Sequence, residues 1–133
     1  MNILISDSNT EVLSALRLVL EQKPGFTISG EASDLISLFS SITQCCPDFV
    51  ILDADLHGFK PIIGETKNGL SKLLDTIRQL CPCVYVITLS SLPNLEQNCL
   101  QAGANAFACK SDPPDKLLGL LDNLIKENQP ESS

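Results

Sequence analysis

Four consecutive apolar residues, Phe49-Val50-Ile51-Leu52, lead directly into the carboxylate of Asp53. An unbroken apolar run of this length is typical of a strand buried on both faces, at the centre of a parallel sheet. In open parallel sheets, ligands bind at the carboxyl ends of the strands, because the connections diverge there. The run therefore predicts a central strand and makes Asp53 the first candidate for a functional residue.

Four other short segments predict strands, and an apolar stripe at helical spacing follows each of the five strands. The other strands are expected at Asn2–Ser6, Phe26–Gly30, Val84–Thr88 and Asn105–Cys109. The alternation predicts an α/β fold, a doubly wound sheet of five parallel strands with five helices on its two faces. We expect Ser8, in a capping box with Glu11, to begin the first helix, and Ser33 to cap the second.

The length of 133 residues is that of one domain, which we assign to residues 1–127. Residues 128–133 are polar and are expected to form a tail or the start of a linker, which favours a further domain after Ser133. No stretch approaches the roughly 18–20 apolar residues that span a bilayer, and Met1 leads straight into a strand. We therefore expect a cytoplasmic protein without membrane contact.

The net charge of −7 opposes attraction to phosphate backbones, so this chain is not expected to hold DNA or RNA without another domain. Six cysteines could form disulfides or bind zinc, and Cys45-Cys46 and Cys81-x-Cys83 are the candidate residues for either. Neither pair has the spacing of a zinc knuckle, and His57 is the only histidine. We predict reduced thiols that act as small apolar side chains.

The predicted strands end in side chains that suit phosphate and a divalent cation. Asp7 with Ser8, Asp53, Thr88 and Lys110 all fall at carboxyl ends, and so at one edge of the sheet. Mg²⁺ prefers oxygen ligands, usually one or two carboxylates with phosphate oxygens and water. A lysine and a hydroxyl can bind the remaining phosphate oxygens, and a carboxylate can itself attack phosphorus. Asp53 is the expected nucleophile.

The same residues give the chain its resemblance to a family. Five motifs in order resemble the receiver domain of two-component response regulators, most of all the NarL/FixJ (LuxR-type) class: Ile3-Leu4-Ile5-x-Asp7, Pro47–Asp53, Thr88-x-Ser90, Gly103–Phe107 and Lys110–Pro114. The match covers nearly the whole chain. The resemblance implies a flavodoxin-like sheet with strand order 2-1-3-4-5.

The resemblance also implies a role for each matching residue. Asp53 would accept a phosphoryl group from a sensor histidine kinase or a small phosphodonor, with Lys110 paired to it. Asp7, Asp53 and the backbone carbonyl of Asp55 would hold Mg²⁺. Thr88 and Phe107 would be the switch residues that change the face formed by the fourth helix, fifth strand and fifth helix. Such a domain is a signalling switch and no enzyme; it controls transcription through a DNA-binding domain outside this chain and allows a homodimer.

Two features depart from the family. Ser8 stands where a second carboxylate is usual, so it is either a helix cap or a weakened metal ligand. The segment after Asp53, with Leu56-His57-Gly58 and apolar residues between 59 and 67, is longer than the usual turn. The alternative interpretation is therefore a pseudo-receiver that binds partners with little use of Mg²⁺. A flavin carrier or thiol transferase on the same scaffold is disfavoured, because no glycine-rich phosphate loop follows the first strand.

Overall fold

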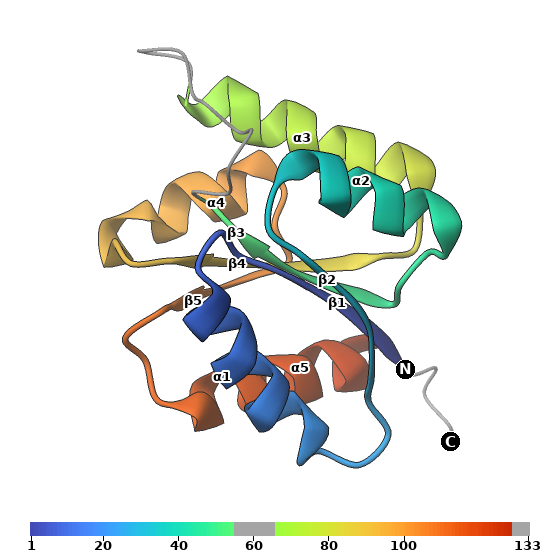
Figure 1. The fold of residues 1–133 in the computed structure, drawn as a ribbon. Coiled ribbons are helices and arrows are strands. Elements are labelled where there is room, and N and C mark those ends of the chain that lie inside the picture. Colours follow the sequence, from blue (N-terminus) through green and yellow to red (C-terminus); the bar gives the residue numbers. More distant parts are fainter. Residues whose placement is uncertain (55–65, 129–133) are drawn as a thin grey trace.

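The predicted central strand lies in the middle of the sheet, as Figure 1 shows for this computed structural model. The structure describes residues 1–54 and 66–128. Five parallel strands run in the order β2-β1-β3-β4-β5, which confirms the predicted fold class. The strands are β1 (Asn2–Ser6), β2 (Thr27–Ala32), β3 (Phe49–Asp53), β4 (Tyr85–Ser90) and β5 (Ala106–Cys109).

Helices cover both faces of the sheet. In the described residues they are α1 (Thr10–Glu21), α2 (Leu35–Gln44), α3 (Thr66–Leu80), the short 3-10 turn η1 (Pro93–Leu95), α4 (Glu96–Ala102) and α5 (Pro114–Asn128). Figure 1 shows α2, α3 and α4 on one face and α1 and α5 on the other. No helix in these ranges is long and apolar enough to cross a membrane.

Two apolar cores lie on the two faces because β3 is buried on both sides. Val50 and Leu52 point into the core beneath α2, α3 and α4, whereas Phe49 and Ile51 point into the core beneath α1 and α5. All five residues of the strand are buried. Since side chains alternate along a strand, this accounts for a continuous apolar run that carries no alternating pattern.

The register brings the carboxyl ends of the strands to one edge. Ser6 of β1 pairs with Leu52, and Asp53 pairs with Leu89 of β4. Ser90, at the end of β4, pairs with Cys109, at the end of β5. The residues that follow these ends, Asp7 and Lys110, therefore meet at the same edge as Asp53.

Some boundaries and caps differ from the predictions. Asn9, and not Ser8, caps α1, because its side-chain oxygen accepts the N–H of Glu11. Asp34, and not Ser33, caps α2 in a reciprocal pair with Ser37. β4 continues two residues past Thr88, so Thr88 lies inside the strand and does not end it.

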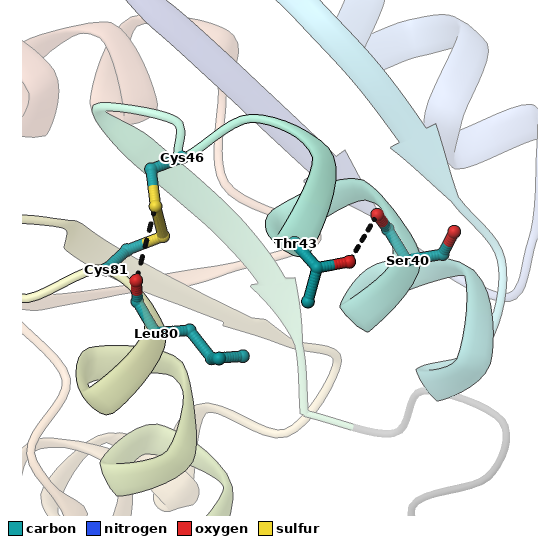
Figure 2. The surroundings of a disulfide bond; sticks show 5 residues. All are labelled: Ser40, Thr43, Cys46, Leu80 and Cys81. Atoms are coloured by element: carbon teal, nitrogen blue, oxygen red, sulfur yellow. Dashed lines mark hydrogen bonds between the residues drawn. A yellow bond between two sulfur atoms is a disulfide. The ribbon is translucent and has the colours of Figure 1, made fainter.

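The prediction that all the cysteines are reduced is wrong, because Cys46 and Cys81 form a disulfide (Figure 2). Cys45 and Cys83 are free and exposed, and Cys99 and Cys109 are free and buried. Spacing in the sequence gave no signal for the bond, since 35 positions separate the two residues. Their Cα atoms are 5.7 Å apart because the ends of α2 and α3 lie together, and this distance suits a disulfide.

Candidate functional site at the carboxyl edge of the sheet

Asp7 is fixed at the end of β1 by its own backbone and by the start of α1. Its N–H donates to the carbonyl of Ala32 at 3.0 Å, which extends the β1–β2 pairing by one residue. Its Oδ1 accepts the N–H of Asn9 at 2.9 Å. Asp7 is only 1% exposed. A carboxylate this deeply buried is costly unless it has a partner of opposite charge.

Asp53 ends β3 and is held in the same way at one oxygen. Its Oδ2 accepts the N–H of Ser8 at 3.4 Å, a long and weak bond, and Asp53 is 2% exposed. The N–H of the next residue, Ala54, donates to the carbonyl of Leu89 and so keeps the strand paired up to this point. The carboxylate is thus aimed at the edge of the sheet and is not buried in either apolar core.

Lys110 supplies the opposite charge for both carboxylates. Its N–H donates to the carbonyl of Ser90 at 2.8 Å, which fixes the residue at the end of β5. Its ammonium Nζ lies 2.8 Å from Oδ2 of Asp7 and 3.1 Å from Oδ1 of Asp53. Burial lowers the pKa of this ammonium, but the contacts with Asp7 and Asp53 together raise the pKa more, so it lies above the ordinary 10.5.

The three side chains leave one unit of negative charge at the site, because one ammonium faces two carboxylates. Oδ2 of Asp7 has no partner with hydrogen-bond geometry in the part of the chain that the structure describes, and the ion pair with Lys110 is its compensation. Excess charge and a buried carboxylate oxygen of this kind fit a divalent cation with oxygen ligands. Within the described residues, no three acidic, histidine or cysteine side chains are grouped so that they could hold a metal ion, so Asp7 and Asp53 are the two carboxylates that the described part of this site offers.

Thr88 is close to this edge but its hydroxyl is engaged elsewhere. Thr88 is fully buried, and its Oγ1 donates to the carbonyl of Ala106 on β5 at 3.3 Å. Phe107, its register partner on β5, is 5% exposed and packs in the core beneath α3 and α4. The structure therefore brings Asp7, Asp53 and Lys110 into contact, and it couples Thr88 to β5.

Two other predicted positions have different outcomes. Ser8 is at the site through its backbone N–H, the bond to Asp53 described above. Asp55, predicted to offer its carbonyl, lies outside the described residues, as do His57 and the apolar segment 59–65.

Sequence reasoning gave no role at the site to Asn9, and it named Ser90 only as part of the Thr88-x-Ser90 motif. Asn9 orients Asp7 through its N–H and caps α1 with its side chain. Ser90 is fully buried, and its Oγ accepts the N–H of Leu92 at 3.0 Å while its carbonyl holds Lys110. The Asp-x-Asn spacing at Asp7 was a usable signal, because Asp side chains often accept the N–H two residues on.

Known proteins share this architecture. No protein-family model matches the chain. Over 118 residues it is 35% identical to a Pseudomonas aeruginosa protein named "Putative transcriptional regulator", which covers 87% of this chain and 52% of that protein. The receiver domain of the Escherichia coli stress response regulator RcsB superposes with a TM-score of 0.79 at 26% identity, covering 98% of both chains. The signal receiver domain of NarL from Mycobacterium tuberculosis gives a TM-score of 0.74 at 18% identity, covering 94% and 95%.

The sheet order and the acidic edge define a receiver-type α/β domain. The chain has the fold of the receiver domains of response regulators, and at 26% identity it is similar to the receiver domain of RcsB. It spans about half the length of the curated relatives that it matches.

Proposed function

We propose that this domain accepts a phosphoryl group on Asp53 in the presence of Mg²⁺, and that this modification controls an output. The observation that carries the proposal is the bridge from Lys110 to two buried carboxylates at the carboxyl edge of the sheet. A purely structural ion pair with Lys110 would need one carboxylate. The second carboxylate leaves an excess negative charge, which a further cation would balance.

In the proposed reaction, a carboxylate oxygen of Asp53 attacks the phosphorus of a phosphohistidine or of a small phosphodonor such as acetyl phosphate. A P–O bond to Asp53 forms, and the bond from phosphorus to the donor breaks, so that the donor leaves with the electron pair. Asp7, Asp53 and, as the resemblance implies, the Asp55 carbonyl would hold Mg²⁺, which when bound neutralises charge between the carboxylate and the incoming phosphate. Lys110 then pairs with a phosphoryl oxygen in place of Asp53.

The proposed switch uses the bond between Thr88 and β5. A phosphoryl group on Asp53 offers Thr88 a charged acceptor, which is stronger than the neutral carbonyl of Ala106. If the hydroxyl moves to the phosphate, β5 loses that bond next to Phe107, and the face formed by α4, β5 and α5 can change its packing. The modification then alters binding to a partner.

We further propose that the output is transcription. The curated relatives are named as transcriptional regulators and are about twice as long as the matched region, and an RcsB of Salmonella enterica was solved bound to promoter DNA. A DNA-binding domain outside this chain would supply the DNA contact. A sensor histidine kinase is the proposed donor, the cytoplasm is the proposed location, and a homodimer is the proposed assembly.

A direct test incubates the protein with acetyl phosphate and Mg²⁺ and measures its intact mass. The wild-type protein is expected to gain the mass of one phosphoryl group and to lose the gain when Mg²⁺ is removed by a chelator. Asp53→Asn should show no gain, whereas the matched control Asp122→Asn, which removes a carboxylate of α5 that pairs with Lys23, should behave as wild type. No gain in the wild type, or an equal gain in Asp53→Asn, would refute the phosphoacceptor role.

The second candidate function, a pseudo-receiver that signals by constitutive binding, is favoured by one observation: Ser8, in the position where a second carboxylate is usual, brings no charge to the site. Titration with Mg²⁺ separates the two. Binding that disappears in Asp7→Ala supports the phosphorylated switch, and failure to bind at any concentration supports the pseudo-receiver.

A further inference from the structure

The amino edge of the sheet, opposite the acidic site, carries four of the six cysteines. Cys45 and Cys46 lie between the end of α2 and the start of β3, and Cys81 and Cys83 lie between the end of α3 and the start of β4. The disulfide joins Cys46 to Cys81, and so it links the connections that enter two adjacent strands (Figure 2). The two bonded cysteines each stand within two positions of a free, exposed one.

The two sulfur atoms of the disulfide differ in access. Cys46 is exposed, whereas Cys81 is 3% exposed and packs in the core beneath α2 and α3. Thiol–disulfide exchange needs a thiolate to reach one sulfur atom, and disulfides that are open to attack are the labile ones. An incoming thiolate can thus approach Cys46, and Cys81 is the leaving group.

The surroundings of Cys46 and Cys81 also suit the two reduced thiols. Sγ of Cys46 lies 3.3 Å from the carbonyl oxygen of Leu80, the last residue of α3, so a reduced Cys46 has an acceptor for its S–H (Figure 2). The backbone N–H of Cys81 donates to the carbonyl of Ile77, and its carbonyl accepts the N–H of Val84, so the backbone of Cys81 is held by bonds that do not involve its sulfur atom. A buried reduced Cys81 is simply a small apolar side chain among Ile42, Ile77 and Val84.

We infer that Cys46 and Cys81 form a reversible redox site whose chemistry uses no residue of the acidic site at the opposite edge. In reduction, the thiolate of a low-molecular-weight thiol attacks Sγ of Cys46, a mixed disulfide forms, and Cys81 leaves as a thiolate that takes up a proton. A second thiol attacks the mixed disulfide, which frees Cys46 and gives the oxidised low-molecular-weight disulfide. Oxidation is the reverse, with that disulfide accepting the two electrons.

The bond constrains the segment that contains the phosphoacceptor. The closed loop runs from Cys46 to Cys81 and includes β3 with Asp53, and α3. A cross-link over a loop of this length removes conformations from the unfolded chain, and the oxidised protein is expected to melt higher by roughly 10 °C. The redox state therefore sets the stability of the unit on which the acidic site is built.

The test equilibrates the full chain in glutathione buffers of different ratio, blocks free thiols with an alkylating agent under denaturing conditions, and counts the labels by intact mass. With excess reduced glutathione we expect all six cysteines to be labelled. With excess oxidised glutathione we expect two fewer labels, a Cys46–Cys81 peptide in the digest, and the higher melting temperature.

Variants keep the test decisive. Cys46→Ser, at the exposed position, should take all its remaining labels in either buffer and show no shift in melting temperature with redox state. Cys45→Ser and Cys83→Ser are the matched controls, and each should keep the reversible bond and the shift. Six labels in every buffer, a bond that survives excess reduced glutathione, or a bond made through Cys45 or Cys83 would overturn the inference.

Discussion

At the scale of single residues, Lys110 is the side chain on which the acidic edge depends. Asp7 and Asp53 are almost completely buried, and the pairing of β1 with β3 fixes them near each other. Two carboxylates in such a position repel each other, and each loses its hydration. The ammonium of Lys110 faces both, and its own side chain is only 22% exposed, so solvent screens these contacts poorly.

Replacing Lys110 with methionine should therefore destabilise the domain. The change keeps much of the side-chain length and removes the charge, which leaves two buried carboxylates without a cation. We expect the free energy of unfolding at pH 7 without Mg²⁺ to fall by about 3 kcal/mol, measured by urea denaturation. The folded pKa of Lys110 is above 10.5, so its contribution is complete below pH 10.5 and is lost only as the pH rises through the higher folded value.

Lys116→Met is the matched control, because the same substitution there removes an exposed pair. Lys116 lies 3.3 Å from Asp112, and its side chain is 48% exposed. Exposed pairs contribute little, so we expect a change of less than about 1 kcal/mol. Equal effects of the two substitutions would mean that Lys110 is not the compensating charge of the acidic edge.

The residues of this site differ in how well sequence could find them. Asp7, Asp53 and Lys110 each follow an apolar run, and the topology of a parallel sheet then brings them together. Thr88 was placed correctly near the edge but wrongly at a strand end. The strand was predicted to stop at its first polar residue, whereas β4 continues through Leu89 and Ser90. Which oxygen accepts the hydroxyl of Thr88 depends on β5, and no local pattern around Thr88 contains that information.

At the scale of elements, the C-terminus of α4 makes capping hydrogen bonds, whereas its N-terminus has no side-chain cap. It has seven residues, it follows the 3-10 turn η1, and its first turn has no side-chain cap. Cys99 and Ala102 are its buried residues. Gly103 ends it with φ of 117°, and its N–H bonds to the helix carbonyls of Cys99 and Leu100. The left-handed conformation at Gly103 is therefore what turns the chain from α4 into β5.

Gly103→Ala should destabilise the domain, whereas Gly119→Ala should stabilise it. At Gly103 an alanine must adopt positive φ, and its Cβ would lie 3.1 Å from a guanidinium nitrogen of Arg78, so we expect a loss of about 1–2 kcal/mol. Gly119 lies inside α5 with nothing within 4 Å of an added Cβ, so alanine should gain about 0.5–1 kcal/mol from helix propensity. Denaturation of both variants tests this, and a shift of the same sign in both would contradict it.

Element ends show where local rules failed and why. β1 and β3 were predicted to the residue, because a change from apolar to polar residues marks both of their ends. The caps of α1 and α2 were each predicted one residue early, since Ser8-Asn9 and Ser33-Asp34 place two good capping residues side by side. Which of two adjacent residues caps the helix depends on where the preceding strand ends, and tertiary packing determines that position. The disulfide was missed for a similar reason, since only the packing of α2 beside α3 brings its ends together.

At the scale of the whole molecule, the two edges of one sheet carry different chemistry. The carboxyl edge gathers the charges of Asp7, Asp53 and Lys110, and the amino edge carries the disulfide. The strands between them are buried in two cores, one on each face. Because a domain of this size usually unfolds as one cooperative unit, an event at either edge is expected to change the stability of the whole.

Binding of Mg²⁺ at the carboxyl edge should therefore be measurable as a rise in melting temperature. A cation that binds only the folded state at ten times its Kd stabilises by about 1.4 kcal/mol, which is roughly 5 °C for a domain of this length. Asp7→Asn should abolish the rise with Mg²⁺, whereas Asp122→Asn, an equal loss of charge at the ion pair between α5 and Lys23, should keep it. Ser8→Asp adds a carboxylate beside Asp53 and should move the rise to lower Mg²⁺ concentration. A melting temperature that does not change with Mg²⁺ in the wild type or in Ser8→Asp would show that these carboxylates hold no cation.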